Sequence, residues 1–124
     1  VMRMFPFALA IAATGLLAAC ETQGTRRIGD LTQSELDTGR RILSADPTRR
    51  QWLVNECRAD ARMQSRQRTA NMAVLMKVTP AQAPTVYCDR LIKGLESGRL
   101  TAADLNSAKR GMITSPVLAV LQGE

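Results

Sequence analysis

The sequence predicts an all-α domain, a small bundle of four or five short helices cross-linked by one disulfide, after a cleaved signal peptide. At 124 residues there is room for one small domain. Outside an N-terminal apolar run, Trp52 and Tyr87 are the only aromatic residues. The core must therefore be aliphatic, a composition that suits helices better than sheets, which are rich in aromatic and β-branched residues. Several well-formed helix-start signals give the same prediction.

The N-terminal segment has the pattern of an export signal. Arg3 is followed by 16 uncharged residues, 4–19, which end in small side chains. A membrane span needs about 20 apolar residues, so this run is short for a span and has the size of a secretory signal peptide. We therefore expect a signal peptide over 1–19, a tether over 20–30 and a helical domain over 31–124. The tether is polar and aperiodic, and its two arginines would lie near lipid head groups.

The end of that run, Leu17-Ala18-Ala19-Cys20, resembles the lipobox of bacterial lipoproteins. The resemblance implies cleavage between Ala19 and Cys20, a diacylglyceryl group on the Cys20 thiol and usually an acyl chain such as palmitate on the new amino terminus. Two or three acyl chains anchor a protein firmly, since each buried methylene contributes about 0.8 kcal/mol. Glu21, in place of Asp, favours the outer membrane, with the domain facing the periplasm. The alternatives are an ordinary secretory signal and an uncleaved short anchor.

Lipidation of Cys20 leaves Cys57 and Cys88 as an even pair in an oxidising compartment. This arithmetic predicts one disulfide, and the alternative is two separate buried thiols. In the chain-entropy model, closing a loop of about 31 residues stabilises the fold by roughly 3.7 kcal/mol. The chain has no His and no CxxC pair. We therefore expect neither a metal site nor a redox function, and no cofactor.

Two segments share a helix-start pattern. Thr32 and Glu35 have the spacing of a capping box, and Thr101 and Asp104 repeat it. Residues 29–47 align with residues 98–116 at six identical positions of 19. Each copy predicts a helix, a turn and a second helix that begins with a cap residue and Pro. The similarity indicates either a duplicated unit or only the resemblance between good helix starts.

The helix that begins at Asp46-Pro47 is predicted to continue through at least Gln67 and to place Cys57 on its core face. A continuous helix to Lys77 would carry the chain about 30 Å beyond Cys57, too far for an easy return to Cys88. We therefore expect a break at 68–72, followed by a separate apolar segment.

Arg58, Arg62 and Arg66 recur at i, i+4 and i+8 along that helix. They are the candidate anion-binding residues, for a phosphate-bearing lipid or an acidic envelope polymer. The alternative is a solvated or internally paired face, with partners among Asp89, Glu96 and Asp104.

Two further helices complete the predicted bundle. Cys88, Leu91, Ile92 and Leu95 form a core stripe, and Gly98 fits a C-terminal cap. The C-terminal segment 115–124 predicts a short helix that covers the core, or alternatively one that binds a partner.

The chain lacks the usual catalytic constellations. There is no His for general-base chemistry, no Gly-rich phosphate loop and no SxxK motif. We therefore predict a non-enzymatic envelope lipoprotein, attached to the membrane through Cys20, with an accessory or scaffolding role through contacts with an envelope protein. The alternatives are a module that binds anionic lipid or polymer and a small inhibitor of an envelope enzyme. The net charge is +6, but export excludes nucleic acid as a partner.

Overall fold

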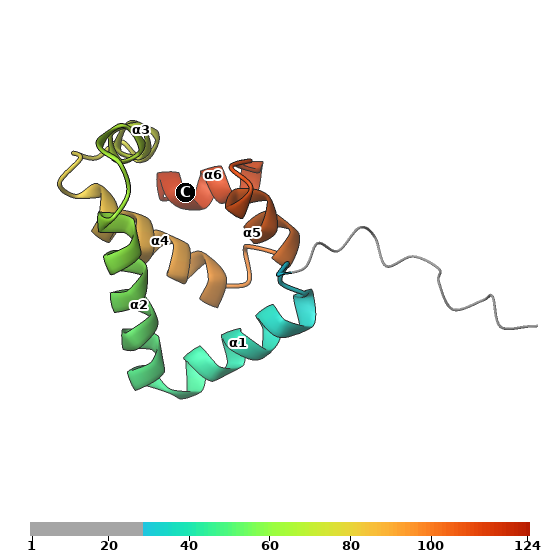
Figure 1. Cartoon of the computed structure of the whole chain (residues 1–124). Coiled ribbons are helices and arrows are strands. Elements are labelled where there is room, and N and C mark those ends of the chain that lie inside the picture. Colours follow the sequence, from blue (N-terminus) through green and yellow to red (C-terminus); the bar gives the residue numbers. More distant parts are fainter. Residues whose placement is uncertain (1–28) are drawn as a thin grey trace, which may run out of the picture.

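The computed structural model describes residues 29–124, and this part of the chain contains six α-helices and no strand (Figure 1). The all-α prediction is confirmed, as is the single disulfide. The described helices number six, not four or five, because the apolar segment after residue 70 belongs to a helix of its own. The helices are α1 (Gln33–Ala45), α2 (Pro47–Arg62), α3 (Arg66–Met76), α4 (Ala83–Glu96), α5 (Ala102–Lys109) and α6 (Ser115–Gln122).

Side-chain caps begin three of these helices as the sequence predicts. The Thr32 hydroxyl accepts a hydrogen bond from the Glu35 amide, and the Glu35 carboxylate accepts one from the Thr32 amide. Thr101 and Asp104 form the same reciprocal pair at the start of α5. The Asp46 carboxylate accepts from the first amides of α2, which begins with proline. Each cap satisfies amides that have no partner inside their helix.

The predicted extent of the second helix was wrong. α2 ends at Arg62 rather than beyond Gln67, and residues 68–72, where the break was expected, lie inside α3. The physical reason is Ser65, whose hydroxyl accepts a hydrogen bond from the Arg68 amide and so caps a new helix. The earlier break allows α3 to turn back and pack against α4.

Helix α4 lies at the centre of the domain and contacts α1, α2, α3 and α6 (Figure 1). Its Gly94 is buried against α6, where an added Cβ would lie only 2.7 Å from Cγ1 of Val120. The last helix, α6, covers the core, as the sequence predicts. Its apolar side chains Val117, Val120 and Leu121 are buried within the fold and do not form a surface for a partner. The main buried cluster is Ala73, Met76, Ala83, Leu100, Val117, Val120 and Leu121.

The two similar segments face each other. The backbone of Leu31 exchanges two hydrogen bonds with the Asn106 amide group, at 2.9 and 2.8 Å. Gln33 Oε1 accepts from the amide of Ala102, the position equivalent to Gln33 in the other segment. The helix starts of α1 and α5 therefore satisfy each other's polar groups.

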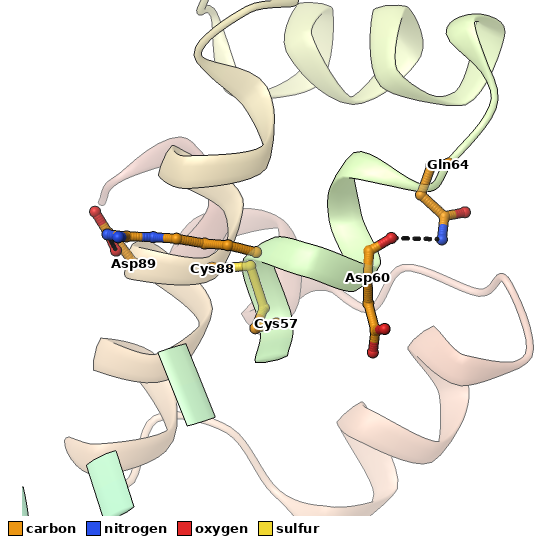
Figure 2. The surroundings of a disulfide bond; sticks show 6 residues. Cys57, Asp60, Gln64, Cys88 and Asp89 are labelled. Carbon is orange, nitrogen blue, oxygen red and sulfur yellow. Dashed lines mark hydrogen bonds and ion pairs between the residues drawn. A yellow bond between two sulfur atoms is a disulfide. The ribbon is translucent and has the colours of Figure 1, made fainter. Parts of the chain in front are cut away.

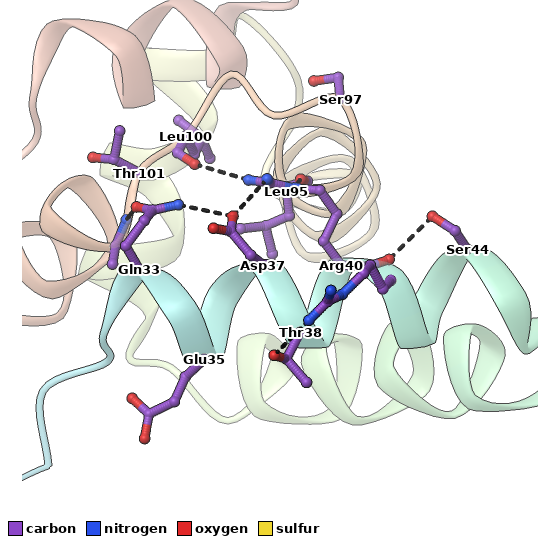
Figure 3. Close-up of polar contacts among 12 residues, drawn as sticks. Gln33, Glu35, Asp37, Thr38, Arg40, Ser44, Leu95, Ser97, Leu100 and Thr101 are labelled. Atoms are coloured by element: carbon purple, nitrogen blue, oxygen red, sulfur yellow. Dashed lines mark hydrogen bonds and ion pairs between the residues drawn. The ribbon is translucent and has the colours of Figure 1, made fainter.

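A second contact between the segments is also reciprocal. Arg40 donates from Nε to the carbonyl oxygen of Leu95 at 2.7 Å and from Nη2 to that of Leu100 at 3.4 Å (Figure 3). At the position equivalent to Arg40, Lys109 donates to the carbonyl oxygen of Gly29 at 3.1 Å. Each segment thus sends a basic side chain to the backbone that precedes the other segment's helix.

Candidate functional site

The predicted lipidation and cleavage residues, Ala19 and Cys20, lie outside the described residues, so both assignments stay predictions. Within residues 29–124, no helix combines the length and apolar character that a membrane span requires. Over the same range, no group of His, Cys, Asp or Glu side chains is arranged to hold a metal ion.

The disulfide joins Cys57 of α2 to Cys88 of α4, with Cα atoms 5.8 Å apart (Figure 2). This confirms the predicted pairing. Cys88 is fully buried, and α2 and α4 cross at this bond. Figure 2 also shows Asp89 on one side of the disulfide and Asp60 on the other, so the crossing has two faces.

The face with Asp89 holds an ion pair, which shows that the predicted stripe of three free arginines is wrong. Arg58 Nη2 donates to the Asp89 carboxylate at 2.8 Å, so Arg58 is bound within the fold. Arg62 is the last residue of α2 and Arg66 the first of α3, because the helix breaks between them. The three arginines therefore do not share one helical face. Arg62 and Arg66 are exposed, and no acidic partner for them lies in the described residues.

The other face of the crossing contains an open cavity of about 490 Å³ between α2, α3 and α4. Its lining is mainly apolar, and α3 contributes part of it because the chain turns back after Arg62. The apolar lining is formed by Leu53, Cys57, Ala61, Met72, Ala83, Pro84, Tyr87 and Leu91.

A second apolar cavity, of about 380 Å³, adjoins the first in the angle between α1 and α2. Leu53 lines both cavities, while Ile42 and Trp52 line the second. Trp52 is 63% exposed, which is unusual for the largest apolar side chain in the chain. We call these two adjoining cavities the α2 trough.

The rim of the α2 trough is polar and carries both signs of charge. Glu56 and Asp60, one turn apart on α2, line the larger cavity, and Arg68 lies on the opposite wall. In residues 29–124, neither carboxylate has a hydrogen bond or an ion pair. Apart from Glu124 at the C-terminus, every other acidic side chain in that range has such a partner.

Two groups have shifted pKa values. Burial raises the pKa of the Tyr87 hydroxyl, which lies in the lining of the trough. The pKa of Asp104 is lowered chiefly by the hydrogen bond from the Thr101 backbone amide and then by the Thr114 hydroxyl at 2.7 Å. The Asp104 carboxylate therefore joins the start of α5 to the start of α6, which is a structural role.

The sequence itself contains a pattern that indicates the α2 side of the trough. Trp52, Glu56 and Asp60 recur at i, i+4 and i+8, the same spacing as the arginines, and so share one side of α2. A Trp and two acids on one helical face indicate an exposed surface with an apolar end. The opposite walls come from α3 and α4, so only the tertiary fold reveals the cavity.

Comparison with protein-family models, curated proteins and solved structures finds no match for this chain. Within the described residues, the α2 trough is the surface feature that best indicates a function.

Proposed function

We propose that this protein is an envelope lipoprotein, anchored through Cys20 to the outer membrane and facing the periplasm, that acts by binding another protein. Its role is then accessory or scaffolding, without catalysis. The lipobox-like sequence before Cys20 supports the anchor. The helical domain after residue 30 follows it closely enough to stay near the membrane surface.

The exposed Trp52 beside an apolar cavity is the observation that carries the protein-binding role. Tryptophan is enriched in protein interfaces and in the residues that dominate their binding energy. Burying its ring and the adjacent Ile42 against a partner would remove apolar surface from water, with a gain of about 25 cal/mol per Å². Their exposure on a small domain therefore favours a docking function.

Mass spectrometry of the membrane-extracted protein tests the anchor. We expect a mature chain that begins at Cys20 and carries the mass of a diacylglyceryl group and an acyl chain. An unmodified Cys20, or a chain that still begins at Val1, would show that the anchor is wrong.

Site-specific photo-crosslinking in cells tests the protein-binding role. A photoreactive residue replaces Trp52 in one variant and Val74 in a matched control, because Val74 is 79% exposed on α3 but does not line the trough. We expect a discrete protein adduct from position 52 and none from position 74. Equal labelling at both positions, or none at either, would contradict the proposal.

A second candidate function is binding of an anionic lipid or polymer through Arg62 and Arg66, which are exposed where α2 meets α3. Replacing both with Glu should weaken retention on heparin, used as an anionic polymer, more than replacing Arg41 and Lys93 does. Arg58 is left intact because it pairs with Asp89. Equal losses from the two double variants would mean that only net charge matters.

A further inference from the structure

We infer that the α2 trough binds a peptide segment of a partner protein in which apolar side chains lie next to Lys or Arg. This inference deepens the proposed function. It rests on the protein-binding role and is independent of the lipid anchor.

The size and lining of the trough require apolar side chains in its occupant. The larger cavity, about 490 Å³, falls within the range of roughly 300–1,000 Å³ that ligand pockets occupy. Leu53, Met72 and Leu91 line it from three different helices, and the disulfide at Cys57 holds α2 and α4 in place beneath it. The pocket is therefore preformed, which lowers the entropic cost of binding.

Two carboxylates on the α2 side of the rim favour a cation in the occupant. Glu56 and Asp60 are exposed and unpaired within residues 29–124, although the whole chain has a net charge of +6. Five other acidic side chains in residues 29–124 pair with arginines, so these two unpaired carboxylates distinguish the α2 side of the rim. The positive charges at the trough lie elsewhere, on Arg68 in the opposite wall and on Arg49, which lines the second cavity and pairs with Asp46. A Lys or Arg beside an apolar side chain would place its charge at these carboxylates while the apolar group enters the cavity.

The opposite wall favours a peptide over a simple organic cation. Arg68 Nη1 donates to Gln64 Oε1 at 2.9 Å, and the guanidinium makes no other hydrogen bond to the described residues. Peptide carbonyl oxygens are suitable acceptors for its remaining N–H groups. An anionic lipid surface would meet Arg68 but would be repelled by Glu56 and Asp60, so the trough does not suit it.

The chain offers a native reporter for the test, because Trp52 is its only tryptophan and lies in the trough. The probe is the peptide acetyl-Lys-Leu-Gly-Lys-Leu-Gly-amide, titrated into the full chain in a nonionic detergent. We expect a saturable change in Trp52 fluorescence, at least about tenfold weaker affinity for the peptide with Glu in place of Lys, and weaker binding as salt is raised.

Two variants, each with a matched control, test the charge and the cavity that binding requires. Glu56→Gln with Asp60→Asn should weaken binding of the Lys peptide about threefold to tenfold, because each exposed ion pair contributes modestly. Glu124→Gln removes an unpaired carboxylate outside the trough and should change the affinity less than twofold. Ala61→Phe should block the cavity, whereas Val74→Phe on the outer side of α3 should not.

Three outcomes would overturn the inference. They are equal affinity for the Lys and Glu peptides, equal effects of the trough and Glu124 variants, and a fluorescence change that depends on protein concentration alone. The last outcome would mean that a second copy of the chain covers the trough. If the peptide fails to bind while position 52 still crosslinks to a protein, the proposed function stands and the chemistry assigned to the partner is wrong.

Discussion

Arg90 of α4 donates a hydrogen bond from Nη1 to the carbonyl oxygen of Leu121, near the C-terminus of α6, at 2.5 Å. The same nitrogen donates to the carbonyl oxygen of Met76, the last residue of α3, at 3.1 Å. One guanidinium thus satisfies carbonyl groups at the C-terminal ends of two helices and places a positive charge at the negative end of each helix dipole.

Replacing Arg90 with Met should therefore destabilise the fold. The change keeps the apolar part of the side chain but leaves the carbonyl groups of two buried residues without their donor, at a cost of about 2 kcal/mol. Urea unfolding followed by circular dichroism measures the loss. The matched variant Arg62→Met removes an exposed arginine with no partner in the described residues and should unfold within about 0.5 kcal/mol of the original. An equally small change at Arg90 would show that its hydrogen bonds add nothing.

Gly94 and Gly39 should respond in opposite directions to replacement by Ala. A Cβ on Gly94 would lie 2.7 Å from Cγ1 of Val120, so α4 and α6 would have to separate, at a cost of about 1–3 kcal/mol. A Cβ on Gly39 meets no atom within 4 Å, and Ala there should stabilise α1 by about 0.5–1 kcal/mol. Thermal unfolding of both variants checks the sign, and a stabilised Gly94→Ala would mean that the two helices are less closely packed.

Charge reversal should lower the stability of the fold at Arg58 but not at Arg62. Arg58→Glu places a second acid beside Asp89 and breaks the ion pair that joins α2 to α4, so we expect a loss of about 1–2 kcal/mol. Arg62→Glu should have little effect on stability. Combining Arg58→Glu with Asp89→Arg should recover part of the loss, which denaturant unfolding can measure. Failure of the swap to recover any stability would assign the effect to packing rather than charge.

The lowered pKa of Asp104 predicts a specific loss of stability in acid. The folded-state pKa of Asp104 lies below the ordinary Asp value of 3.8, so its stabilising contribution is fully present above that value. The contribution is lost as the pH falls through the folded-state pKa, because protonation removes the carboxylate that accepts from Thr101 and Thr114. The Asp104→Asn variant should be less stable at neutral pH and should lose less stability between pH 5 and pH 2 (values about one unit above and two units below the ordinary pKa). Parallel acid titrations of the two proteins would contradict this assignment.

Much of the fold followed from local sequence. The capping pairs Thr32–Glu35 and Thr101–Asp104 predict helix starts because a side chain and a nearby amide can satisfy each other with no help from the rest of the chain. The pairing of Cys57 with Cys88 could also be predicted, since no other partner was left once Cys20 was assigned to lipid. Where the prediction failed, at the end of α2, the Ser65 cap competed with a continuing helical pattern.

The functional surface depended on the tertiary structure. Sequence spacing placed Arg58 in a stripe with Arg62 and Arg66, but the fold gives Arg58 an acid 31 residues away and breaks the helix that would have aligned the other two. The α2 trough likewise joins Leu53, Met72 and Leu91 from three helices. A capping pair lies within four residues and is set by local geometry, whereas an ion pair or a cavity between helices depends on how distant segments pack, which no local pattern specifies.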